Sequence, residues 1–373
     1  MSQSTSKISL SHIPRSMLLA IVLLVGLASY MIWDQSYWWE SREDYSFGYL
    51  VPLFALFVLY DRKEAILSAI QGRASSSNIN EELSARPRPT GDSNGDSKLN
   101  IIADLMACGA FIIGCTLYFI GGLLRSATMP QNPATLALSM GFALIFLSLA
   151  FIFSKKTLSG EPMKLKNRIS FMLIFLFPAL IWLISAPLVS VVETKIRVFL
   201  LTQVTVIIFS LFDFLGFAIE RQGNILVLPN GVVGVEEACS GIRSLTACIF
   251  AGSFLAAVYL KAFWKKSMLI GMALILAVLT NLFRSGFLTL WAYIYGAEAI
   301  NDHWVLPIIG DIGSVHDVMG LAVLVLTTIG LLLLIPILNF NLNAYMNRFL
   351  DNSSPSNSAD HSESDQEKEV IES

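Results

Sequence analysis

Long apolar runs separated by short polar segments constrain this chain more than any other feature. A run of about 20 apolar residues can cross a bilayer as a helix. Only 14% of the 373 residues are charged, whereas soluble domains carry roughly 25%. We therefore expect an all-α polytopic membrane helix bundle. The eight runs expected to cross the membrane are residues 17–33, 47–60, 101–124, 134–153, 169–189, 245–260, 268–294 and 318–338.

The distribution of lysine and arginine predicts the orientation of the bundle. Basic residues gather before the first run and in the loops "DRKE", "KKTLSGEPMKLKNR" and "KAFWKK", and short basic loops remain in the cytoplasm. Both termini are then cytoplasmic. Because Arg168 and residues 261–266 lie on the same side, residues 198–219 cannot be a ninth span. We expect an amphipathic helix at the outer interface there.

Four segments follow from this pattern. Residues 1–60 hold the first two spans, and the bulky aromatic residues after the first run indicate a retained helix rather than a cleaved signal peptide. Residues 61–100 are a polar cytoplasmic insert, and residues 341–373 are an acidic cytoplasmic tail. Both are expected to be disordered because they hold few apolar residues. Residues 101–340 form the transmembrane core, which holds the candidate catalytic residues.

Three polar residues from separate segments fall at one depth in this topology. Cys239 precedes the run 245–260 on the outer side, and His316 precedes the run 318–338 on the same side. Arg284 lies sixteen residues after Met268, which is roughly 24 Å up a helix that starts at the inner face. A charge facing lipid is costly, so Arg284 should point into the bundle.

Thiol, imidazole and guanidinium together suffice for acyl transfer from a peptide bond. A thiolate is a strong nucleophile when a nearby cation lowers its pKa, and Arg243 is one turn from Cys239. Histidine can accept the thiol proton and return it to the leaving amine. Arginine can stabilise the oxyanion. The product would be a thioester on Cys239, transferred to water or to an amine.

Alternatives remain for each residue. Taken singly, Cys239 can be structural, Arg284 can extend its head group to the interface, and His316 can belong to a helix cap. His303 is the rival base. Supporting roles are open to four residues: Asn281 could orient Arg284, Glu236 could orient the histidine or bind a substrate cation, and Arg243 and Ser240 flank the nucleophile.

The sequence gives no reason to expect a cofactor, a metal ion or a nucleic-acid partner. The four cysteines form no CxxC pair and have no zinc spacing. His303 and His316 are too far apart to argue for a metal site. No basic patch with interleaved aromatic residues is present, which argues against nucleic acid.

Three motifs in order, "ACSGIRSL", "NLFRSGF" and "HDVMG", resemble those of the exosortase/archaeosortase family of membrane-embedded, sortase-like cysteine transpeptidases. The stretch "DYSFGYLVPLFALFVLYDRK" is similar to another region of that family, in which many members have histidine where this chain has Phe47. The resemblance covers most of residues 30–340. It implies that Cys239 is the nucleophile, His316 the base and acid, and Arg284 the transition-state stabiliser.

The resemblance also implies a substrate class and a location. Exosortases process exported proteins with a C-terminal sorting signal, the PEP-CTERM type of short motif, transmembrane helix and basic cluster, and many such substrates are linked to exopolysaccharide production. The site would face the periplasm from the bacterial inner membrane, among membrane lipids. Two alternatives are a hydrolytic thiol protease and a non-enzymatic polysaccharide export or assembly protein. Spans almost free of charge apart from Arg284 argue against transport. The recognition motif, the acceptor and the oligomeric state stay open.

Overall fold

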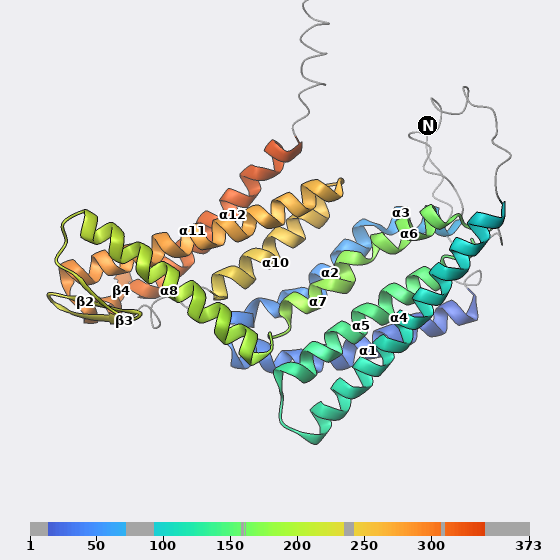
Figure 1. Cartoon of the computed structure of the whole chain (residues 1–373), viewed down its shortest axis with the longest axis horizontal. Coiled ribbons are helices and arrows are strands. Elements are labelled where there is room, and N and C mark those ends of the chain that lie inside the picture. Colours follow the sequence, from blue (N-terminus) through green and yellow to red (C-terminus); the bar gives the residue numbers. More distant parts are fainter. Residues whose placement is uncertain are drawn as a thin grey trace, which may run out of the picture.

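A computed structural model describes residues 14–71, 93–157, 160, 162–234, 242–306 and 310–339. It confirms the expected all-α polytopic bundle, in which most of the long helices run side by side (Figure 1). The helices are α1 (Arg15–Ser41), η2 (Glu43–Leu50), α2 (Val51–Asp61), α3 (Lys63–Gln71), α4 (Ser93–Ala127), α5 (Asn132–Phe153), α6 (Leu165–Ile174), α7 (Leu176–Ser185), α8 (Ser190–Phe214), α10 (Ile242–Tyr259), α11 (Phe263–Tyr295), η3 (Ala297–Ile300) and α12 (Val315–Asn339).

The count of eight spans is not confirmed. Among the described residues, six helices are long and apolar enough to cross a membrane, namely α1, α4, α5, α8, α11 and α12. The pair α6 and α7 would make a seventh. The helix α2 has only 11 residues, and the apolar helix Ser244–Tyr259 is also shorter than a typical span.

The break between α6 and α7 has a local cause. The two helices are bent by 41°, and Pro178 has no N–H to donate to the carbonyl of Ile174, four residues earlier. The guanidinium of Arg62 donates to that carbonyl instead, at 2.5 Å. A second Arg62 bond, to the carbonyl of Ala257 at 3.0 Å, joins this break to α10. The bend is therefore held by a specific contact.

The helix α8, which the sequence analysis placed at the outer interface, qualifies as a span by length and composition alone. In Figure 1 it runs across the direction of the other long helices, at the end where the strands lie. Leu201, Val204 and Ile208 are buried on one face. The opposite face is also apolar, with Phe199 and Leu211 exposed, so this helix is suited to contact lipid.

Two small antiparallel sheets were not expected from the sequence. The polar stretch before Cys239 folds into β1 (Glu220–Gln222), β2 (Ile225–Leu228) and β3 (Gly231–Gly234), in the order β1-β2-β3. A second pair consists of β4 (His303–Leu306) and β5 (Gly310–Ser314). The sequence pattern that could have predicted the first sheet is the pair of turn motifs "GN" and "PNG" between short runs of β-branched residues.

The polar insert is helical at both ends, because α3 occupies residues 63–71 and α4 begins at Ser93. Its middle, residues 72–92, lies outside the described residues, as does the acidic tail.

Charged residues inside the helices are more numerous than the sequence analysis stated. Asp34 of α1 is fully buried and pairs with Arg125 of α4 at 2.6 Å. Arg168 of α6 is also buried and pairs with Asp104 of α4 at 2.5 Å. Pairing offsets part of the cost of burying such charges. Arg284 is therefore not the only charge in these helices, which corrects the argument made above from charge-free spans.

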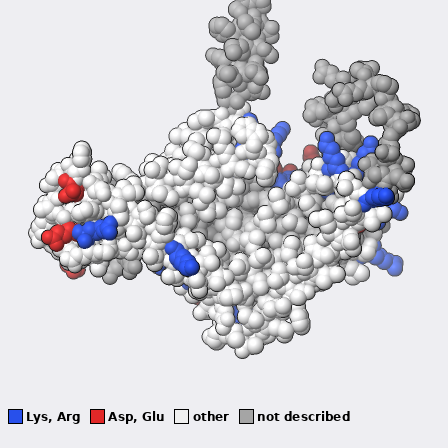
Figure 2. Space-filling view, in the orientation of Figure 1, with Lys and Arg blue, Asp and Glu red and all other residues white. Residues whose placement is uncertain are grey.

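Lysine and arginine gather at one end of the molecule (Figure 2). This end carries α3, α6 and the connection between α10 and α11 (Figure 1). Acidic and basic side chains share the opposite end, and the surface between the two ends is almost uncharged in this view. Such a distribution is typical of a membrane protein whose basic end is cytoplasmic.

Candidate active site

Arg284 and His316, which the sequence analysis placed at one depth, lie in contact. Arg284 is a buried residue of α11, and His316 is in the first turn of α12. A guanidinium N–H of Arg284 lies 2.9 Å from Nε2 of His316. The same nitrogen, Nη2, donates to the His316 carbonyl at 3.2 Å. The two side chains come from separate helices, and α12 begins directly after β5, at the end of the bundle that carries the strands (Figure 1).

This contact decides the state of the imidazole. Arginine has only donors, so Nε2 of His316 must accept and the proton of the neutral ring must be on Nδ1. Nδ1 faces the Asp317 carboxylate at 3.3 Å. In the neutral ring, His316 thus directs Nε2 toward Arg284 and its N–H toward the Asp317 carboxylate. Nε2 becomes available as a base once the guanidinium of Arg284 moves away from it.

A capping box fixes the start of α12, and with it His316. The Asp317 N–H donates to the Ser314 hydroxyl at 3.2 Å, and the Ser314 N–H donates to Asp317 Oδ2, also at 3.2 Å. The Ser314 hydroxyl donates to the same oxygen at 2.8 Å. Such reciprocal bonds satisfy the free N–H groups of a helix start. The expectation that His316 lies in a capping segment is therefore met, and this segment also presents the imidazole to Arg284.

Gly320 provides room for the guanidinium. It lies one turn after His316 on α12, and a Cβ built there would be 3.4 Å from Nη2 of Arg284. A longer side chain would occupy the space of the guanidinium. The motif "HDVMG" thus supplies both the imidazole and the space beside it, a role of glycine that the sequence analysis did not consider.

Buried polar atoms without partners gather beside Arg284. Within the described part of the chain, Nε of Arg284, Oδ1 of Asn281 and the hydroxyl of Ser285 have no hydrogen-bond partner. Asn281 therefore does not orient Arg284 through these atoms, as had been suggested. Buried unsatisfied polar groups are uncommon and are found at functional sites.

The nucleophile segment lies outside the described residues. Residues 235–241 include Cys239, Glu236 and Ser240, and the side chain of Arg243 is not described either. The described neighbours of this segment are close to His316, because Val233 and Gly234 of β3 line a cavity of about 190 Å³ together with His316, Ile300 and Asn301. The chain therefore leaves this cavity five residues before Cys239.

His303, the rival base, has a different environment. Its Nδ1 lies 2.9 Å from Asp311 of β5, and its side chain is 61% exposed, compared with 26% for His316. The N–H of Gly313, and after it His303, lowers the pKa of Asp311. This pair closes the hairpin β4–β5 near the start of α12. The geometry favours His316 as the group that acts with Arg284.

An ion-pair cluster near the start of α10 was missed by the sequence analysis. Both guanidinium nitrogens of Arg42 bond to the carboxylate of Glu193 on α8. Arg197 bonds to Glu193 at 3.2 Å and to Asp44 of η2 at 3.4 Å. Burial raises the pKa of Asp44, against the opposing effect of Arg197 and Arg42. The sequence pattern that could have predicted this cluster is the pair of charged segments "ESRED" and "ETKIR".

The start of α10 is attached to η2. The hydroxyl of Thr246 donates to the carbonyl of Asp44 at 3.1 Å. Phe47 packs on Phe250 of α10, with ring centroids 4.9 Å apart. Phe47 is thus packed against an apolar core cluster.

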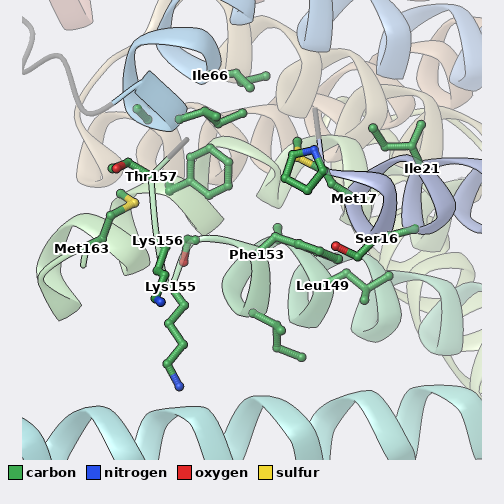
Figure 3. A pocket seen from close by; sticks show the side chains of 18 of the residues that line it. Ser16, Met17, Ile21, Ile66, Leu149, Phe153, Lys155, Lys156, Thr157 and Met163 are labelled. Carbon is green, nitrogen blue, oxygen red and sulfur yellow. The ribbon is translucent and has the colours of Figure 1, made fainter. Parts of the chain in front are cut away.

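A cavity of about 590 Å³ lies among α1, α3 and α5, beside the connection from α5 to α6 (Figure 3). Apolar side chains of α1, α3 and α5 line it, including Met17, Ile66 and Phe153, and Lys155 and Lys156 lie at its rim. Of the described residues around it, none is a cysteine or a histidine. In the part of the chain that the structure describes, no group of three or more His, Cys, Asp or Glu could hold a metal ion.

Comparison with known proteins identifies the family. No curated protein and no solved structure matches the chain. The sequence model described as "transmembrane exosortase" matches residues 38–334, a range that includes Arg284, His316, both sheets and the segment with Cys239. This match covers most of the chain and confirms the expected resemblance, so the chain belongs to the transmembrane exosortase family.

Proposed function

We propose that this chain is a multi-pass inner-membrane cysteine transpeptidase that cleaves the C-terminal sorting signal of exported proteins at the outer membrane face. Membership of the exosortase family supports a sortase-like membrane transpeptidase that acts on proteins with sorting signals. The observation that carries the residue assignment is the contact between Arg284 and His316, made by two helices at the end of the bundle that carries the strands. Cys239 is the proposed nucleophile.

The reaction begins with the thiol of Cys239. Nε2 of His316 accepts the thiol proton, and the thiolate attacks the scissile carbonyl. The guanidinium of Arg284 stays protonated. Its N–H stops donating a hydrogen bond to Nε2 and donates one to the carbonyl oxygen, which becomes negative. One movement of the guanidinium therefore exposes the base and stabilises the oxyanion. Asp317 holds the Nδ1–H side of the ring.

The second half releases the products. His316 gives its proton to the leaving nitrogen, the C–N bond breaks, and the acyl group remains as a thioester on Cys239. An amine or water then attacks the thioester carbonyl while His316 accepts its proton. The C–S bond breaks, and the departing thiolate of Cys239 takes that proton back from His316. An amine acceptor gives transfer, and water gives hydrolysis.

The distribution of charge supports a periplasmic site. Lysine and arginine gather at the end of the bundle away from the strands (Figures 1 and 2), and basic ends of membrane proteins remain in the cytoplasm. A substrate anchored by one helix with a basic tail would have the same orientation. Its segment just outside the membrane would then reach the site, and confinement to the bilayer increases the frequency of encounters.

The test is loss of the proposed nucleophile. Cys239→Ala should reduce processing of a tagged substrate to below about one thousandth of the wild-type rate, with normal protein level. Cys108→Ala, which removes an exposed thiol of α4, is the matched control and should process normally. Normal processing by Cys239→Ala would exclude the proposal.

The same assay separates the two histidines. His316→Ala should lower the rate by about a hundredfold or more, as expected for loss of a general base, whereas His303→Ala should remain close to the wild type. The opposite result would assign the base to His303. Mass spectrometry of the new C-terminus distinguishes a free carboxylate, made by hydrolysis, from an amide made by transfer.

A further inference from the structure

One edge of the three-stranded sheet presents unpaired backbone groups beside the candidate site. A two-residue turn, Pro229 and Asn230, joins β2 to β3, and Leu228 faces Gly231 as the closing pair. The closing pair of such a turn exchanges backbone hydrogen bonds, and the next pair does not. The N–H and C=O groups of Val232 and Gly234 therefore point away from β2. No described residue forms a hydrogen bond with them.

This outer edge shares a cavity with His316. Val232, Val233 and Gly234 form one wall of the cavity of about 190 Å³, and Asn301 and His316 contribute polar groups to it. The buried side chain of Val233 is in the same apolar core cluster as Ile300 of η3, so the sheet is held in place. Arg284 bonds to the same histidine. A ligand on this edge would thus lie beside both side chains.

The two edges of the sheet differ in a way that indicates a use for β3. On the other edge, β1 carries Glu220, Arg221 and Gln222, all exposed. Charged side chains are a common protection of edge strands against pairing with another chain. The strand β3 has the sequence "GVVG", with no charge and no bulky side chain. It is the edge that can accept another strand.

We propose that the substrate binds by adding an extended segment to β3 as a fourth strand. The inference rests on the proposed function and specifies how that site holds its peptide. Addition to a sheet edge is a general mode of peptide recognition, in which main-chain bonds give affinity and alternate side chains give specificity. β3 spans about 13 Å and an added strand lies about 4.8 Å from it, so the segment would cross the cavity of His316.

This mode suits a membrane transpeptidase for a physical reason. A scissile bond must be extended for a thiolate and an oxyanion donor to approach its carbonyl from different sides. Strand addition holds the peptide in that conformation without contacts to particular side chains. The strand β3 then leads within five residues to the proposed nucleophile.

A proline substitution tests the pairing directly. Val232→Pro removes an outward N–H without changing the bonds between β2 and β3, and proline is tolerated at an edge whose N–H points outward. Gly231, the preceding residue, has no Cβ for the ring to strike. Processing of the tagged substrate should fall about tenfold or more, because a main-chain bond is lost and the ring blocks the edge.

The sheet offers a matched control. Like Val232, Arg221 of β1 is next to a residue of a closing pair, here Gln222 with Ile225, so its N–H points outward from the opposite edge. Arg221→Pro should process substrate within about twofold of the wild type, as surface substitutions do. Equal losses in both variants would overturn the inference, as would normal processing by Val232→Pro.

A labelling experiment reports whether the site is intact. Cys239 is labelled with a small maleimide in a variant in which alanine replaces the other three cysteines, Cys108, Cys115 and Cys248. Cys239 should react at the same rate in the Val232→Pro variant as in the protein that keeps Val232. If Cys239→Ala abolishes processing while Val232→Pro does not affect it, strand addition alone fails. If Cys239→Ala has no effect, the proposed function fails.

A second measurement uses the unchanged enzyme, so it holds if Val232→Pro does not fold. Peptides copied from the cleaved segment of the tagged substrate are N-methylated at one residue at a time. A paired strand directs every second N–H to its neighbour. Methylation at every second residue should therefore lower the cleavage rate, and methylation at the residues between should not. Equal effects at all positions, or none, would overturn the inference.

Discussion

At the scale of single residues, the candidate site combines groups whose positions depend on small neighbours. A Cβ at position 320 would make ordinary contact with the guanidinium of Arg284, at 3.4 Å, so a side chain larger than alanine there would displace the guanidinium from His316. His316 is directed by the cap that Ser314 and Asp317 form. The depth of Arg284 and His316 could be predicted from the sequence, because helix rise and loop charge place each residue along the membrane normal. Their contact could not, because rotation of each helix about its axis is a matter of packing.

Enlarging Gly320 should disable the site without touching the proposed catalytic groups. Gly320→Leu would displace the Arg284 guanidinium, and a misplacement of about 1 Å can lower a rate by about a hundredfold. The measurement is the processing rate of the tagged substrate. Gly286→Leu on α11 is the control, because no atom lies within 4 Å of a Cβ built at Gly286. Equal rates for the two variants would contradict the role given to Gly320.

At the scale of elements, the site region depends on how α8, η2 and the start of α10 are joined. Arg42, Glu193 and Arg197 connect α1 to α8, and Asp44 connects this cluster to Thr246 of α10. Breaking a buried ion pair leaves the other charge without a partner, which costs more than the pair contributes. The attachment of α8 across the other helices therefore depends on Glu193.

Glu193→Ala should destabilise the protein by roughly 1–2 kcal/mol, because the Glu193 carboxylate is buried while the arginines it leaves behind are partly exposed. A lower midpoint of thermal unfolding in detergent would report it. Lys195→Ala, at an exposed position on the same helix, should leave the midpoint unchanged. A midpoint for Glu193→Ala equal to that of Lys195→Ala would exclude the structural role of the cluster.

At the scale of the whole molecule, the two ends of the bundle differ in charge and in content. One end has most of the lysine and arginine and the apolar cavity of about 590 Å³ (Figures 2 and 3). The other end has both sheets and the contact between Arg284 and His316 (Figure 1). Cytoplasmic retention of basic loops sets the orientation of such a bundle.

Single cysteines introduced into a cysteine-free variant test this orientation. Arg221→Cys in β1 should react with an impermeant maleimide in intact spheroplasts, because the proposed orientation places its end of the bundle in the periplasm. Lys156→Cys, exposed at the basic end, should react only after permeabilisation. The reverse pattern would invert the topology and exclude a periplasmic site.

The sequence by itself determined the class of this protein. The length of each apolar run and the charge of each loop are local properties, and they decide which segments can cross a bilayer. It also predicted that Arg284 and His316 lie at one level of the bundle, and their contact agrees with this prediction. Only the tertiary structure decided that α8 crosses the other helices, that the stretch before Cys239 is a sheet with one open edge, and that Arg284 bonds to His316. These features depend on lateral packing and on pairing between distant segments, such as Arg42 with Glu193, which no local pattern specifies.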